Sequence, residues 1–183
     1  MKQTKKITLS AMAIALGVLF MTLGFFVEVL DMTVAALCSC LMAFVFIEIG
    51  AKYAVAVWLG TSLLGAVFFT SSLVWVTFFL VFGVFPILKA FIERLKRPFW
   101  IPLKLAFFLV SATVMILVSE LVLGIPFFND EINIPFLSDN VALFRIVVYL
   151  LMIAAFFVYD IFMTVMIRTY FTSIRNRIKS LLK

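Results

Sequence analysis

The sequence predicts an all-α integral membrane protein with six transmembrane helices in one bundle. Of its 183 residues, 66% are hydrophobic, and the mean hydropathy is +1.27. Soluble domains are only about half apolar, so a water-soluble core could not hide this much apolar surface. The apolar residues also form six continuous runs, each close to the ~20 residues that cross a hydrocarbon core. We therefore expect one transmembrane domain over residues 1–183.

The six runs are continuous in hydrophobicity rather than alternating, which excludes the strands of a membrane β-barrel. The first run is longer than the apolar core of a signal peptide, and no convincing cleavage site follows it. In the fourth run, Gly83 and Pro86 predict a kink. The predicted helices cover residues 7–27, 32–49, 53–69, 73–92, 103–123 and 141–167, and a short basic tail follows at 168–183.

Basic residues predict the orientation of these helices. With six crossings, all 15 Lys and Arg residues except Arg145 fall on the same side as the two termini. The positive-inside rule then places both termini in the cytoplasm, as expected for a multi-pass protein of the bacterial cytoplasmic membrane. The net charge of +6 is explained by contact with anionic lipid, which we favour over nucleic-acid binding for the basic tail.

The residue types present do not predict an enzyme. The chain has no histidine, which is the commonest general base and a common metal ligand. It also has no phosphate-binding loop and no nucleophile motif. Cys38 and Cys40 lie inside an apolar run at a spacing that is not typical of a metal or redox site, so we interpret them as small buried residues. We expect no cofactor and no metal.

Charged residues inside the apolar runs are candidates for function, because charge at membrane depth is costly. Two of them have simple explanations. Glu48 has Lys52 four residues later as a helical partner. Lys89 is expected to extend its ammonium group to the cytoplasmic interface, with assistance from Glu93.

Glu120 and Arg145 are harder to explain, because they lie at similar depths near the outer ends of neighbouring helices and are expected to meet. We predict that they bind a solute together with Thr113, which shares a helical face with Glu120, and Tyr149. The alternative is a buried pair that only fixes the register of two helices. Asp160 lies deeper, without an obvious partner in the sequence, and we assign it a structural or gating role. The inward face of the last helix is predicted to carry Arg145, Tyr149, Met152, Phe156, Asp160 and Met163.

The first helix carries small residues on two faces. Ser10, Ala13 and Gly17 share one face, which is expected to pack within the bundle because membrane helices approach closely through small residues. Ala11 and Ala15 lie roughly opposite. Our hypothesis is that these two alanines form a shallow groove for a partner's helix; the alternative is that alanine is simply tolerated against lipid.

The opening KKITLSAMAIALGVLF and the stretch LCSCLMAFVFIEIGAKYAVAVWLGTSLLGAVF, with Gly50 at a cytoplasmic turn, resemble the substrate-binding S component of energy-coupling factor transporters. The resemblance implies capture of a small water-soluble micronutrient, such as a vitamin or a precursor, in a cavity on the outer side. It also implies that the alanine-rich helix docks on a transmembrane T component driven by two ATPase subunits. No ligand-specific motif identifies the solute.

A second class of function fits the same composition. A non-transporting membrane scaffold of the cell-envelope or rod-shape type has a similar size and helix count and binds only protein partners. Such a scaffold would need no polar cavity, and it would tolerate apolar residues in place of Glu120 and Arg145.

Overall fold

The computed structural model describes residues 3–27, 30–70, 72–121, 124 and 141–174. Its described residues form helices, turns and bends without a strand, and six spans are long and apolar enough to cross a membrane. The predicted all-α fold with six apolar helices is therefore confirmed, and it indicates a multi-pass membrane protein. The connection between the fifth and sixth predicted helices, except for Gly124, and the basic tail from residue 175 lie outside the described residues.

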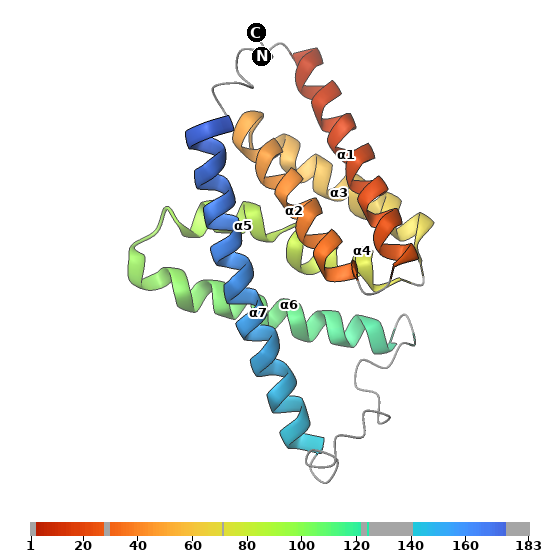
Figure 1. Ribbon diagram of the computed structural model, residues 1–183, viewed down its shortest axis with the longest axis vertical. Helices are drawn as coiled ribbons and strands as arrows, with labels where there is room; N and C mark the ends of the chain where they lie inside the picture. Colours follow the sequence, from red (N-terminus) through yellow and green to blue (C-terminus); the bar gives the residue numbers. More distant parts are fainter. Residues whose placement is uncertain (1–2, 28–29, 71, 122–123, 125–140, 175–183) are drawn as a thin grey trace.

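The first three helices lie side by side (Figure 1). Small residues allow this approach: a Cβ atom added to Gly17 of the first helix would lie only 2.8 Å from Thr61 Cγ2 of the third. Gly50 has a φ of 109° at the turn between the second and third helices, a value that glycine adopts without strain. We call these three helices the N-terminal group: α1 (Gln3–Phe26), α2 (Asp31–Glu48) and α3 (Ala51–Phe68).

The fourth span is interrupted, as Gly83 and Pro86 predict. It consists of α4 (Leu73–Thr77), a π-helical segment η2 (Phe78–Phe82) and α5 (Phe85–Ile92). The Gly83 N–H donates to the Phe78 carbonyl at 2.6 Å, five residues back instead of four. Pro86 follows in the first turn of α5, where its missing N–H is best tolerated.

A tryptophan from α3 stabilises this interruption. In an α-helix the Gly83 N–H would pair with the Phe79 carbonyl. Here the Phe79 carbonyl accepts a hydrogen bond from Trp58 Nε1 at 3.1 Å instead. The Trp58 and Phe79 rings also stack, with centroids 5.0 Å apart. The π segment is therefore a supported feature of the fold, of the kind often found near functional sites.

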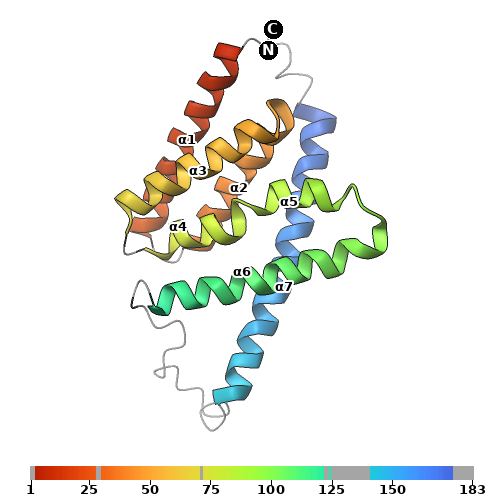
Figure 2. The same ribbon diagram turned by 180° about the vertical axis from the view of Figure 1, so that it is seen from behind.

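The last two spans cross each other. After a short turn, η3 (Arg97–Phe99), α6 (Trp100–Leu121) runs beside the interrupted fourth span, and α7 (Val141–Thr169) crosses α6 and reaches α2. A final π-helical segment, η4 (Tyr170–Ile174), continues α7. In Figures 1 and 2 the end of α6 and the start of α7 lie apart, on different sides of this crossing.

Aromatic side chains fill the crossing. Phe156 of α7 lies between two rings, with centroid distances of 4.5 Å to Phe108 of α6 and 5.0 Å to Phe85 of α5. Tyr159, one turn further along α7, lies 5.3 Å from the Phe85 ring. Three helices, α5, α6 and α7, therefore share one aromatic core.

Candidate functional site

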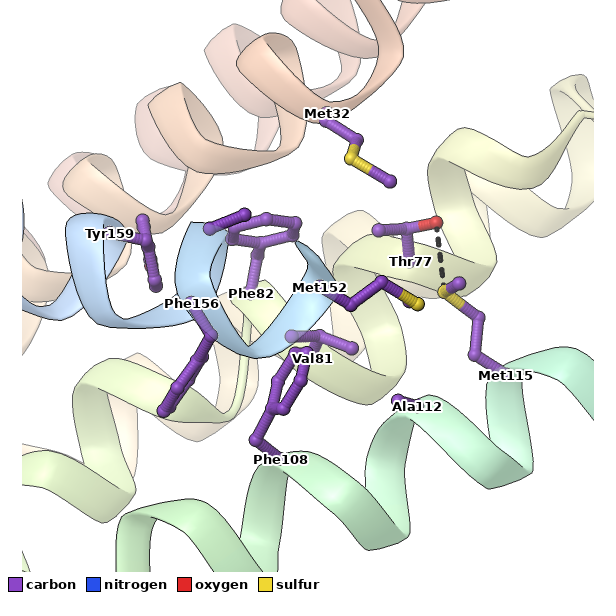
Figure 3. Close-up of a pocket in the computed structure, with 11 residues that line it drawn as sticks. Met32, Thr77, Val81, Phe82, Phe108, Ala112, Met115, Met152, Phe156 and Tyr159 are labelled. Atoms are coloured by element: carbon purple, nitrogen blue, oxygen red, sulfur yellow. Dashed lines mark hydrogen bonds between the residues drawn. The ribbon is translucent and has the colours of Figure 1, made fainter. Parts of the chain in front are cut away.

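A small cavity lies next to this aromatic core, with a volume of about 90 Å³. Its walls come from the start of α2, the interrupted fourth span, α6 and α7, and Figure 3 shows side chains from all four directed toward one space. The described lining residues are Met32, Thr77, Val81, Phe82, Phe108, Ala112, Met115, Met152, Ala155, Phe156 and Tyr159.

Aromatic rings and thioethers dominate the cavity walls, and none of the described lining residues is charged. Two hydroxyl groups lie among them. The Thr77 hydroxyl donates to the Leu73 carbonyl at 2.8 Å and lies 3.5 Å from Met115 Sδ. The Tyr159 hydroxyl donates to Ser39 Oγ at 2.5 Å. Both hydroxyl groups therefore already donate within the protein, and the cavity wall is almost entirely apolar. This cavity suits a neutral ring or an apolar group rather than a charged one.

A network of four charged side chains lies beside the cavity, at the crossing of α5, α6 and α7. Asp160 of α7 accepts hydrogen bonds from Lys89 and from Lys104, whose Nζ lies 2.9 Å from Asp160 Oδ2. Glu93 Oε1 lies 3.2 Å from Lys89 Nζ and 3.1 Å from Lys104 Nζ. Lys89 also donates to the Thr164 hydroxyl at 2.7 Å. We call Lys89, Glu93, Lys104 and Asp160 the ionic network; its formal charges sum to zero.

The ionic network corrects the expectation for Lys89. Only 2% of its side chain is exposed, so its ammonium group does not extend to an interface. The sequence offers no obvious partner for Asp160. The fold brings two cations, Lys89 and Lys104, to its carboxylate. The predicted assistance from Glu93 is confirmed, at 3.2 Å from Lys89 Nζ. The predicted extension to the interface was wrong because sequence spacing within one helix cannot show a carboxylate 71 residues away.

The predicted solute-binding residues are spread over two helices. Glu120 and Thr113 are on the exposed face of α6, whereas the cavity uses Phe108, Ala112 and Met115 from the opposite side of that helix. Thr113 donates its hydroxyl hydrogen to the Leu109 carbonyl at 2.8 Å.

On α7, Tyr149 is half-buried, and the backbone of Arg145 is helical, while its side chain lies outside what the structure describes. The ends of α6 and α7 that carry Glu120 and Arg145 lie apart in Figure 1. A meeting of these two side chains, and solute binding by them, therefore stay predictions.

The two faces of α1 differ in burial. Ser10, Ala13 and Gly17 are buried against the other helices, whereas Ala11 and Ala15 are exposed. Their docking role stays a prediction. Among the other predicted residues, Cys38 is buried and Cys40 is half-buried.

Sequence reasoning missed Thr77, Tyr159 and Lys104. The available signal for Lys104 was a charged residue inside an apolar run, which is the kind of signal that singled out Asp160. Thr77 and Tyr159 left no signal, because single hydroxyl residues are common in apolar helices. Comparison with protein-family models, with curated proteins and with solved structures gave no match. The function is therefore argued from the site's own chemistry.

Proposed function

We propose that the protein captures a small water-soluble micronutrient, such as a vitamin or a precursor, for uptake across the cytoplasmic membrane. A separate transmembrane T component with two ATPase subunits supplies the energy. Both termini face the cytoplasm, as the distribution of basic residues predicts. The single observation that carries this proposal is the cavity between the interrupted fourth span, α6 and α7.

The cavity's chemistry limits the solute. Thr77 and Tyr159 offer the only hydroxyl groups among the described lining residues, and aromatic rings and methionines form the rest of the wall. Methionine thioethers and aromatic rings make favourable contacts with flat aromatic groups. At about 90 Å³, the cavity is smaller than the roughly 300 Å³ of typical ligand pockets, so it accommodates one ring or an apolar part of the solute.

The exposed alanines of α1 support a separable partner. Lipid is well matched by large apolar side chains, and α1 presents these as well, with Met12 and Leu19 more than half exposed. Ala11 and Ala15 form a shallow depression between such side chains, where another helix could approach closely. None of the cavity's described lining residues belongs to α1, so docking through this face would not occupy the cavity.

Filling the cavity tests the capture function. The protein is purified in mild detergent from cells grown on rich medium, and small molecules released on denaturation are identified by mass spectrometry. Ala112→Phe places a ring inside the cavity and should abolish the release of bound solute, while the folded fraction is retained. Ala106→Phe makes the same change on the exposed face of α6 and should retain the solute. Equal solute release from the two variants would contradict capture in this cavity. A scaffold function predicts this equal release.

The docking face is tested separately. Ala11→Trp together with Ala15→Trp should abolish co-purification of the T component and ATPases by steric bulk. Solute binding by the detergent-solubilised variant should stay at the wild-type level. Partner subunits that remain bound to this double variant would exclude docking through these two alanines.

A further inference from the structure

We propose that the ionic network closes one end of the cavity and positions the α7 wall, so that opening the network opens the cavity. The closed end faces the side where α6 begins and α7 ends. The proposal rests on the proposed function for the identification of the cavity as the solute site and for the orientation that places this end at the cytoplasmic side.

The network borders the cavity on two helices at once. On α7, Tyr159 lines the cavity and the next residue, Asp160, is the centre of the network. On α6, Lys104 precedes the lining residue Phe108 by one helical turn, which is about 6 Å along the axis. The four charges therefore lie directly beyond the last cavity residues, toward the same end of both helices.

A ring connects the charges to the cavity wall. Lys89 Nζ lies 5.7 Å from the centroid of the Phe85 ring. Phe85 in turn packs against Phe156 and Tyr159, at centroid distances of 5.0 and 5.3 Å, and these two residues line the cavity. Displacement of Lys89 would remove support from Phe85 and hence from two aromatic residues of the wall.

One turn of α7 is held from both sides. Tyr159 is tied to Ser39 of α2 through its hydroxyl group, and Asp160 is tied to Lys89 of α5 and Lys104 of α6. A shift of α7 would therefore break the ionic network and move the cavity wall at the same time. The network is also within reach of the surface, because Glu93 is 34% exposed while Lys89 is 2% exposed. Opening would begin at Glu93 and proceed inward.

Access of a thiol reagent to the cavity tests this closure without any solute. The reporter is Ala112→Cys, a buried lining position, in a background with Cys38→Ala and Cys40→Ala. The perturbing variant is Lys104→Gln with Asp160→Asn, which removes one charge of each sign and leaves the Lys89–Glu93 pair at 3.2 Å. Inverted membrane vesicles, which expose the cytoplasmic side, are treated with a small water-soluble methanethiosulfonate reagent.

We call Lys104→Gln with Asp160→Asn the charge-balanced variant. The reporter thiol should react about tenfold faster in this variant than with the network intact, because the loss of charged hydrogen bonds raises the fraction of molecules with an open network. Tyr170→Phe is the matched control. It removes a 2.9 Å hydrogen bond from η4 to Glu48 of α2, which also fastens this end of the chain but lies away from the cavity. The control should react at the wild-type rate.

An unchanged rate in the folded charge-balanced variant would overturn the proposal, and so would an equal increase in Tyr170→Phe. If the charge-balanced variant does not fold, Thr164→Val removes only the hydroxyl group that accepts from Lys89 at 2.7 Å and donates to the Asp160 carbonyl at 2.8 Å. That milder variant should raise the rate about threefold, in line with one weaker hydrogen bond, and an unchanged rate would again overturn the closure. Failure of solute capture would leave the reagent rates unaffected, so the two proposals fail independently.

Discussion

The N-terminal group and the crossing of α5, α6 and α7 are held together in different ways. In the N-terminal group, glycines let helices touch: a Cβ atom on Gly17 or Gly60 would lie 2.8 Å from side-chain atoms of a neighbouring helix. At the crossing, aromatic rings and the ionic network connect the helices, and a cavity remains beside them. Close packing through small residues leaves no room for a ligand. Bulky side chains at an oblique crossing, in contrast, leave a space between the helices.

The two regions also differ in their buried charges, because the ionic network lies at the crossing. Charges at membrane depth are expensive, and a buried ion pair is weak evidence for stability in itself. Their position beside the cavity is the observation behind the proposed closure.

The largest expected effect comes from breaking the crossing at its centre. Asp160→Asn removes one carboxylate and leaves the buried Lys89 and Lys104 with a single, partly exposed counterion, Glu93. Breaking a buried pair in this way costs about 3–5 kcal/mol. The thermal midpoint in detergent, followed by size-exclusion chromatography, should fall strongly.

The charge-balanced variant Lys104→Gln with Asp160→Asn is the matched comparison. It leaves no uncompensated charge, so it should recover most of the stability lost in Asp160→Asn. Equal losses in the two variants would mean that the helices are held by the particular hydrogen bonds and not by charge balance.

A smaller effect is expected in the N-terminal group. Gly17→Val places a branched side chain against Thr61, where a Cβ atom alone would lie 2.8 Å from Thr61 Cγ2. Overpacking of this kind costs about 1–3 kcal/mol. Ala15→Val adds a comparable volume on the exposed face and should leave the thermal midpoint of the monomer unchanged. Similar midpoints for the two variants would contradict close packing through this face.

The smallest effect should come from the hydroxyl that links the two regions. Tyr159→Phe removes the hydrogen bond to Ser39 of α2 but keeps the ring in the cavity wall. The expected loss is about 0.5–1.5 kcal/mol, because Ser39 still donates to the Ala36 carbonyl at 2.6 Å. A loss as large as that of Asp160→Asn, measured in the same thermal assay, would show that the two regions are not held independently.

Much of the fold could be predicted from the sequence. Hydropathy and length predict six helices because each apolar run must satisfy its own backbone hydrogen bonds. Gly83 and Pro86 predict the interruption of the fourth span, although not that it takes the form of a π segment. The buried small face of α1 follows from the spacing of Ser10, Ala13 and Gly17.

The site could be predicted only in part. The inward face of α7 was recognised from its spacing, and Met152 and Phe156 of that face line the cavity. The cavity-facing side of α6 was not recognised, because every face of that helix is apolar and the polar Thr113 lies on the exposed one. The partners of Asp160 depend on how distant helices cross, which the pattern within each helix does not contain.

The central claim is that this chain is a capture subunit, and native mass spectrometry of the protein extracted gently from its own membranes tests it most directly. One spectrum reports both bound small molecules and associated proteins. We predict a complex that contains the chain, one small organic solute, a transmembrane T component and two ATPase subunits. A chain that carries no small molecule and is associated only with cell-envelope proteins would contradict the account and favour a scaffold.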